Sequence, residues 1–294
     1  MKPKRVLSLL LCVMIAVMQV PAIVSAEEAA PVWNGSIDTS WYDTNPTASE
    51  YTISGGSALA GLAKLVNDGI SFEDQEIILN SNVDLDSLEW TPIGNKTNKF
   101  MGAFDGGNHE IQNLKISSGV SNLGLFGYAG ELFNSIPNIR NLKLTNCDIQ
   151  VPSANEVGAV IGYISGTVEN CSATGTITGS ENVGGIAGKA YTGNASGTIK
   201  DCSSHVVVSG YRCVGGVAGY MQQVNMTGCY ATGNITGTGD GKESDKKNMG
   251  GLVGYASGSS LSNCFSTGNV SGSINVGGLA GYMYGSMSNC YTTG

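Results

Sequence analysis

The amino-acid sequence predicts an all-β fold in which copies of one repeat wind into a parallel β-helix. Nearly the same opening segment recurs five times after residue 155, with first glycines at steps of 26, 31, 35 and 27 residues: Gly158, Gly184, Gly215, Gly250 and Gly277. Self-similarity at a period of about 20 to 50 residues is typical of stacked solenoids. Behind each opening, small or apolar residues alternate with polar ones, as on a strand with one inward face.

The first residues predict export from the cytoplasm. Three basic residues precede an apolar run over residues 6–20, and small residues lead up to Ala26. This order is typical of a secretory signal peptide, so we expect residues 1–26 to be removed by cleavage. A membrane anchor is the alternative, but the apolar run is short for a span and ends at Pro21.

The remaining chain is acidic and has no second apolar run long enough to span a bilayer. The formal net charge is −8, and losing three basic residues with the signal peptide gives −8 − 3 = −11. An acidic chain without a basic segment argues against nucleic acid as a partner.

One amphipathic helix is expected before the strands. Residues 27–71 contain a polar and aromatic stretch and then a helical pattern over residues 57–68, whose apolar positions share one face: Leu59, Leu62, Ala63 and Val66. Ser57 is the expected N-cap and Gly69 the expected stop. A single helix at this place predicts a cap over the open end of the first coil.

Two blocks of coils are expected after the helix. Residues 72–150 predict the first, irregular coils, because their strand-like runs match the repeat imperfectly. Residues 151–294 predict the regular repeat coils, and we expect the natural solenoid to continue beyond them. In each regular coil, an Asn, Asp or Gly such as Asn170 precedes an inward-facing Cys and is expected at a corner with positive φ.

Six cysteines recur in the same rhythm and predict a buried column of reduced thiols. They are Cys147, Cys171, Cys202, Cys229, Cys264 and Cys290. A disulfide framework is the usual alternative in a secreted chain. Equal positions in successive coils instead favour thiols that pack as small apolar side chains. Cys213 lies off the column and is expected to be exposed, with its redox state left open.

Two longer repeats predict loops that bind partners or contact solvent. The insertions cover residues 191–197 and 236–248, and we expect both on one side of the solenoid. The charged stretch 241–248 predicts a solvated loop, with a tip that contacts protein or glycan as the alternative. Tryptophan side chains near the cap can stack on sugars, although such residues more often belong to the core; they are Trp33, Trp41 and Trp90.

The repeat words resemble the GLUG repeat family. VGGIAG, GGLVGY and VGGLAGY, with the halves NCFSTGNVSG and NCYTTG, carry the resemblance over residues 150–294. The resemblance implies a right-handed parallel β-helix on a bacterial cell surface, and such repeats also occur beside IgA-cleaving metallopeptidases. It implies no catalytic residue. The chain departs from the family pattern at residues 158–160, at Lys189 and at residues 203–205.

The sequence predicts no catalytic, cofactor-binding or metal-binding residues. A zinc peptidase would need two His one helical turn apart, whereas His109 and Glu110 are followed by Asn113 at that spacing. A Cys–His pair would have to join Cys202 and His205, which the alternation of a strand places on opposite faces.

Three acids in the first coils have alternative interpretations. Asp84, Asp86 and Asp105 are most simply turn residues. Calcium ligands and paired carboxylates for glycan cleavage are the two functional alternatives, and the sequence leaves the calcium question open.

The sequence as a whole predicts an exported, surface-displayed β-solenoid scaffold that serves in adhesion or as a display stalk, with no catalysis of its own. The alternatives are the non-catalytic repeat region of a large exported peptidase and a carbohydrate-active β-helix. The expected partner is an unidentified host or cell-wall glycan or protein. The resemblance favours a Gram-positive bacterium, and the anchoring mode is not predicted.

Overall fold

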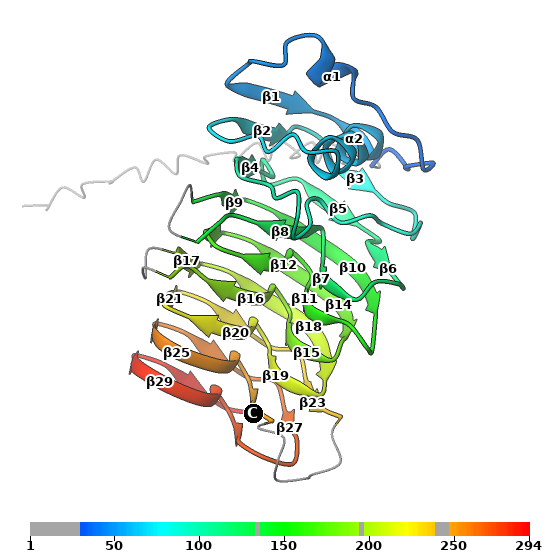
Figure 1. The fold of residues 1–294 in the computed structure, drawn as a ribbon. Coiled ribbons are helices and arrows are strands. Elements are labelled where there is room, and N and C mark those ends of the chain that lie inside the picture. Colours follow the sequence, from blue (N-terminus) through cyan, green and yellow to red (C-terminus); the bar gives the residue numbers. More distant parts are fainter. Residues whose placement is uncertain (1–29, 133–135, 194–196, 239–246) are drawn as a thin grey trace, which may run out of the picture.

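The computed structural model describes residues 30–132, 136–193, 197–238 and 247–294. They form a parallel β-solenoid of about eight turns, with the helices at one end and the last coil at the other (Figure 1). The all-β parallel β-helix predicted from the repeats is therefore confirmed. The predicted signal peptide lies outside the described residues. Within those ranges, no helix is long and apolar enough to cross a membrane.

Sheet A contains eleven strands and is built from the alternating segments of the repeats. Its strands are β3 (Val83–Asp84), β5 (Glu110–Gln112), β6 (Lys115–Ile116), β10 (Lys143–Gln150), β14 (Ser172–Thr178), β18 (Ser203–Gly210), β22 (Tyr230–Ala231), β23 (Ile235–Gly237), β26 (Phe265–Ser266), β27 (Val270–Ser271) and β30 (Tyr291–Thr292). The pairing of β14 with β18 runs parallel and in register from Ser172 to Thr178. Equal positions of successive repeats therefore lie directly above one another.

Sheet B contains thirteen strands and forms the widest face. Its strands are β1 (Glu50–Ile53), β2 (Glu76–Leu79), β4 (Ala103–Asp105), β8 (Phe126–Ala129), β9 (Asn138–Arg140), β12 (Ile161–Ile164), β13 (Thr167–Glu169), β16 (Ala187–Tyr191), β17 (Gly197–Lys200), β20 (Ala218–Gln222), β21 (Val224–Thr227), β25 (Val253–Ser262) and β29 (Ala280–Ser288). The face consists of two ladders that join at β25, which pairs with both β20 and β21.

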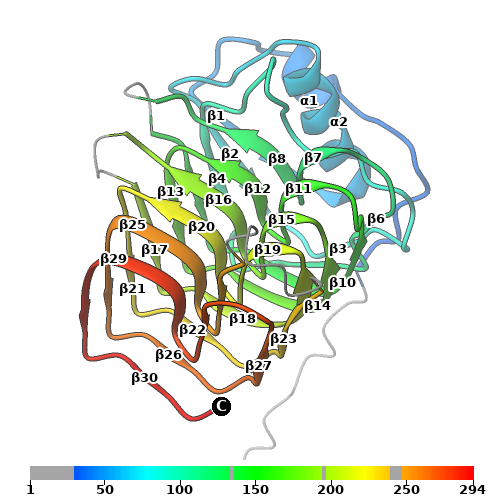
Figure 2. The same cartoon turned by 60° about the horizontal axis from the view of Figure 1, so that its bottom comes forward.

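Sheet C is the smallest face and carries the opening of each repeat. Its strands are β7 (Ser121–Leu123), β11 (Asn155–Gly158), β15 (Glu181–Gly184), β19 (Arg212–Gly215), β24 (Met249–Gly250) and β28 (Val276–Gly277). Figure 2, turned so that the C-terminal coils come forward, shows these coils lying one behind another.

One regular coil passes through all three sheets. From Asn155 the chain forms β11 in sheet C, then β12 and β13 in sheet B, turns at Asn170 and forms β14 in sheet A. The opening segment thus supplies strands on two faces rather than one. The bend between them needs glycine, because a Cβ on Gly184 would lie 2.2 Å from Ala187 O and 2.7 Å from the amide N of Gly219.

The predicted corners are confirmed by the backbone. The corner residues Asn170, Asp201, Gly228, Asn263 and Asn289 have φ between 49° and 66°. Asn170 Nδ2 donates to Asn141 Oδ1 at 2.8 Å, so the corner amides also bond along the axis. A second corner lies at the start of the opening segments, where the residue also has a positive φ: Asn122, Glu156, Asn182, Cys213 and Asn275. The spacing of the sequence did not indicate this corner.

Five of the six periodic cysteines form the predicted column. Strand register aligns Cys171, Cys202, Cys229, Cys264 and Cys290, and the seven cysteines of the described ranges form no disulfide. Each of these five thiols donates to the carbonyl two residues earlier, as Cys202 Sγ does to Lys200 O at 3.2 Å. Cys290 is only half-buried because it belongs to the last coil of the structure.

Two predictions about cysteines are wrong. Cys147 is buried but pairs with Gly175, not with Cys171, because Lys143 pairs with Ser172 and so places Leu142, not Cys147, beside Cys171. Leu142 therefore occupies the position in the column that was predicted for Cys147. Cys213 was expected to be exposed, but only 5% of it is. It lies at the second corner, where Asn248 Nδ2 donates to its Sγ at 3.7 Å.

The two insertions do not lie on one side, contrary to the prediction. Residues 191–197 connect β16 to β17 within sheet B. Residues 236–248 connect β23 of sheet A to β24 of sheet C. Spacing alone could not separate them, because an insertion of either kind lengthens the step between repeats.

The N-terminal residues close the first coils. Helix α1 (Ser40–Asp43) precedes β1, and α2 (Gly55–Asn67) follows it and packs on β3. The apolar face expected for α2 is buried, and the chain leaves the helix through Gly69 at φ 110°. Ser57 is not the N-cap, because the helix begins earlier, after Ser54. The Ser57 hydroxyl instead shares a hydrogen bond of 2.6 Å with Ser36 Oγ.

Candidate functional site

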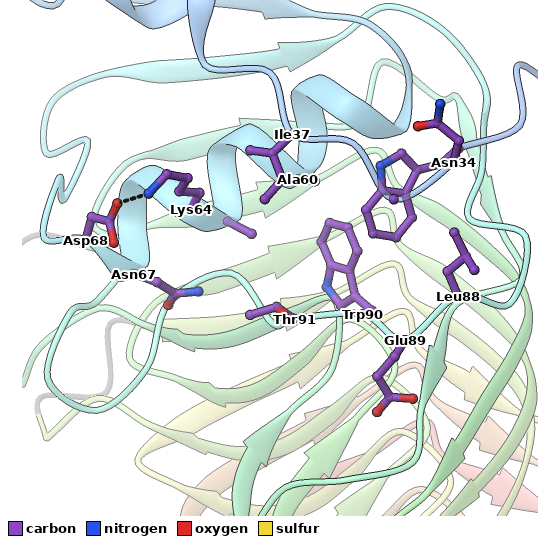
Figure 3. A pocket seen from close by; sticks show the side chains of 13 residues that line it. Asn34, Ile37, Ala60, Lys64, Asn67, Asp68, Leu88, Glu89, Trp90 and Thr91 are labelled. Atoms are coloured by element: carbon purple, nitrogen blue, oxygen red, sulfur yellow. Dashed lines mark hydrogen bonds and ion pairs between the residues drawn. The ribbon is translucent and has the colours of Figure 1, made fainter.

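A pocket of about 470 Å³ lies where the capping helix meets the first coils. Three chain segments form it: residues 33–37, residues 60–68 of α2 and its end, and residues 88–91, which follow β3. Figure 3 shows Trp90 in the middle, the Lys64–Asp68 pair on one side, and Leu88 and Asn34 on the other. The volume falls within the range of about 300 to 1,000 Å³ that is typical of small-molecule sites.

The floor of this pocket is apolar. The rings of Trp33 and Trp90 meet edge to face at 5.7 Å between centroids, and both residues are almost fully buried. Trp33 Nε1 donates to Ser36 O at 2.7 Å, and Trp90 Nε1 donates to Leu125 O at 3.0 Å. Both indole N–H groups are therefore satisfied by carbonyls, and the rings offer the pocket carbon atoms only.

Aliphatic side chains extend the apolar floor to the mouth of the pocket. Ile37 is 56% exposed and Leu88 is 36% exposed, whereas Ala60 and Ala63 are nearly buried in the helix face. Large apolar side chains left open beside a concave surface are typical of ligand or partner contacts.

The rim carries polar groups with hydrogen-bonding capacity to spare. Lys64 Nζ pairs with Asp68 Oδ2 at 2.5 Å, and both side chains are at least half exposed. Asn34 Oδ1 accepts from Ser36 N at 3.1 Å. Within the described residues, Asn34 Nδ2 and the Thr91 hydroxyl have no hydrogen-bond partner. The rim thus presents both donors and acceptors and no net charge from the ion pair.

Two other rim residues are committed to the fold. Glu89 accepts hydrogen bonds from Ser117 N and Ser117 Oγ, each at 2.8 Å. Burial acts to raise the pKa of the Glu89 carboxyl, but these bonds and those from Ser118 outweigh it and lower the pKa. Asn67 Nδ2 donates to Pro92 O at 3.0 Å. Glu89 and Asn67 therefore hold the pocket together rather than offering free groups to a ligand.

The three predicted tryptophans do not act together. Trp33 and Trp90 line the pocket, whereas Trp41 lies in a separate aromatic cluster, 5.3 Å from Tyr51 and 6.0 Å from Phe72 between ring centroids. The sequence placed these residues near the cap but did not show which of them share a cavity.

Of the candidate acids, Asp84 and Asp105 lie on different sheets and are hydrogen-bonded. Asp84 lies in sheet A and accepts from Gln112 Nε2 and Asn113 Nδ2, each at 2.7 Å. Burial opposes these bonds, but together with the backbone N–H of Asp86 they lower the pKa of Asp84. Asp105 lies in sheet B, beside the Arg140 guanidinium at 3.0 Å. Carboxylates that already accept hydrogen bonds from N–H donors fit the interpretation as turn and ladder residues.

Each histidine ring lies within hydrogen-bond distance of a neighbouring polar side chain. His205 is exposed and its Nδ1 lies 2.6 Å from Thr232 Oγ1, while Cys202 points into the core, as the alternation predicted. His109 Nδ1 lies 3.3 Å from Asn82 Oδ1. In the described ranges no group of three or more His, Cys, Asp or Glu side chains is arranged to hold a metal ion.

The outer faces carry aromatic columns. On sheet B, stacked tyrosines follow the axis, with centroid distances of 4.9 Å for Tyr220–Tyr255 and 4.7 Å for Tyr255–Tyr282. Lys189, where the family pattern has Tyr, lies with its Nζ 5.7 Å from the Tyr163 ring and 5.2 Å from the Tyr220 ring. The ammonium thus continues the column through cation–π contacts.

Most of the predicted loop tip at 241–248 lies outside the described residues. Of its two described members, Lys247 is buried with Nζ 4.6 Å over the Tyr211 ring, and Asn248 is also buried. This end of the insertion therefore belongs to the packed coil, not to a solvated loop as predicted.

Two curated relatives resemble parts of this chain. Halomucin of Haloquadratum walsbyi is 33% identical over 168 residues, which is 53% of this chain and 2% of that protein. A protein of Evansella cellulosilytica, provisionally named a Gly-rich membrane protein, is 34% identical over 125 residues, which is 42% of this chain and 14% of that protein. The chain thus spans only a small part of the length of both relatives.

A solved structure shares the fold. A protein from Bacteroides ovatus, provisionally described as an immunoglobulin A1 protease, superimposes with a TM-score of 0.59 at 22% identity, over 83% of this chain and 75% of that chain. At this identity the likeness concerns the architecture alone.

The GLUG motif matches residues 153–178, 210–236 and 247–271. These segments include the openings at Gly158, Gly215 and Gly250, so the motif covers three of the five copies found in the sequence. The resemblance drawn from the repeat words is therefore confirmed, and the chain is a protein with GLUG repeats.

Proposed function

We propose that this protein is a surface-displayed scaffold that holds a binding surface away from the cell and has no catalysis of its own. The proposal rests mainly on one observation: the described residues form a continuous rod of stacked coils, with α2 at its N-terminal end. The names of the two relatives, a halomucin and a Gly-rich membrane protein, support a place at the cell surface.

Side-chain chemistry also favours a scaffold over an enzyme. A glycan-cleaving β-helix needs acids that converge on one face. Here Asp84 and Asp105 lie on different sheets, and each is held by N–H donors. The outward positions of the regular coils instead include stacked aromatic rings and corner amides. Such columns stabilise the rod, since each side chain packs against its equivalents in the neighbouring coils.

Surface display is tested by labelling intact cells of the source organism with an antibody raised against the purified protein. The proposal expects labelling without permeabilisation and loss of the label after brief protease treatment of intact cells. Labelling that requires permeabilisation would contradict it. A parallel incubation with immunoglobulin A1 and with neutral polysaccharides should leave all substrates uncleaved, and turnover of any of them would overturn the scaffold assignment.

A further inference from the structure

We propose that the pocket between the capping helix and residues 88–91 binds a neutral saccharide, with one sugar ring lying on the apolar floor. This inference rests on the proposed function and assigns the binding surface of the scaffold to its N-terminal cap rather than to its repeats. The distribution of apolar and polar groups in the pocket carries the argument.

The floor matches the C–H face of a pyranose ring. Its open surface comes mainly from the side chains of Ile37 and Leu88, with the nearly buried Trp33, Trp90 and Ala60 lining the rest. The indole N–H groups donate to carbonyls at 2.7 Å and 3.0 Å, so the floor has no unsatisfied indole donor that a ligand would have to pair with. Apolar C–H groups can therefore be buried on it without leaving a donor unpaired.

The rim matches hydroxyl groups that radiate from such a ring. The Lys64 ammonium and the Asp68 carboxylate stand on one side, and the Asn34 amide and the Thr91 hydroxyl line other parts of the mouth (Figure 3). Each sugar hydroxyl is both a donor and an acceptor. A rim that offers donors and acceptors around an apolar centre therefore suits a polyol better than a single apolar side chain of a peptide.

The charge of the rim favours a neutral ligand. Lys64 and Asp68 neutralise each other at 2.5 Å, and the Glu89 carboxylate is filled by hydrogen bonds from Ser117. A sulfated or uronic-acid glycan would find one ammonium that is already paired, beside two carboxylates. We therefore expect hexose and N-acetylhexosamine oligosaccharides to bind in preference to acidic ones.

Binding is tested with the purified protein on an array of neutral and acidic oligosaccharides, followed by titration of the strongest neutral probe. Ile37→Ser removes part of the floor, and Asp68→Ala removes a rim acceptor. Both sites are exposed, so folding should be preserved, as unchanged urea midpoints would verify. We expect each variant to weaken binding about tenfold or more.

Two control variants match these changes outside the pocket. Val207→Ser alters another exposed apolar residue, on sheet A, and Lys143→Ala breaks another exposed ion pair, with Glu110. Both should bind like the unaltered protein. The inference is overturned if no neutral saccharide is retained, if the pocket variants bind as tightly as the controls, or if a peptide library binds the pocket instead. Surface labelling of cells would stay positive in each of these cases, so the scaffold proposal is judged separately.

Discussion

The buried hydroxyl of Ser266 is expected to destabilise the solenoid. Its side chain is completely buried inside the tube, and its Oγ has no hydrogen-bond partner among the described residues. Strand register places it in one column with Ala231, Ser204 and Ala173, so alanine already fits this position in two other coils. An unpaired buried polar group costs about 1–3 kcal/mol. Ser266→Ala should therefore raise the free energy of unfolding by about 1–2 kcal/mol.

Urea unfolding measures this change as a higher midpoint at unchanged slope. A domain of this size should gain roughly 2–4 °C in melting temperature per kcal/mol. Ser204→Ala is the matched control, because Ser204 is equally buried but its Oγ accepts from Val206 N at 3.4 Å. The control should be neutral or destabilising. If Ser266→Ala lowers the free energy of unfolding, the hydroxyl is satisfied in solution and the reasoning is refuted.

Three further predictions concern the thiols, the corners and the tyrosine column. Burial raises the pKa of Cys147 to about 12, above the ordinary thiol value of about 8.5. The stability that its protonated form contributes is therefore complete below pH ~8.5 and is lost as the pH rises toward 12. The urea midpoint should fall across this pH range, and it should fall less steeply in Cys147→Ala. Asn170 has a φ of 51°, so Asn170→Ala should lower the free energy of unfolding by about 1–2 kcal/mol, and Asn170→Gly should lower it less. Equal urea midpoints for the two variants would contradict a backbone cause. Lys189→Ala should lower the free energy of unfolding by about 1 kcal/mol, because the cation–π contacts are lost. Lys189→Tyr should restore most of this stability by stacking. A Tyr variant as unstable in urea as the Ala variant would argue against a continuous column.

The regular coils were predictable because their information is repeated. Asn170 and its equivalents could be recognised as corners, since Asn, Asp or Gly recurs directly before the Cys and positive φ explains the choice. Cys147 shows the limit of this reasoning. Its spacing fits the column, but the pairing of Lys143 with Ser172 places Leu142 beside Cys171, and the spacing of the cysteines alone does not reveal this register.

Cys213 and the pocket were missed for different physical reasons. Cys213 occupies a second corner that is otherwise filled by Asn or Glu, so only an alignment of the repeats on their glycines reveals that it belongs to the wall. The pocket joins residues 33–37, 60–68 and 88–91. These segments occur once each, so no periodicity indicates that they meet, and only the packing of α2 on the first coils brings them together.

Repetition itself explains why a ligand site is expected at the cap. In the regular coils many outward groups contact their equivalents in the next coil: Tyr220 and Tyr255 stack with an angle of 9° between their rings, and the Asn170 amide bonds to Asn141. Ring faces that are stacked and amide groups that are hydrogen-bonded in this way are not available to a partner. At the cap the segments have no equivalents to pair with, so the side chain of Ile37 and the amide N–H groups of Asn34 stay open. A solenoid of this kind therefore gains rigidity from its repeats, and the cap, where the repeat is broken, leaves side chains open for recognition.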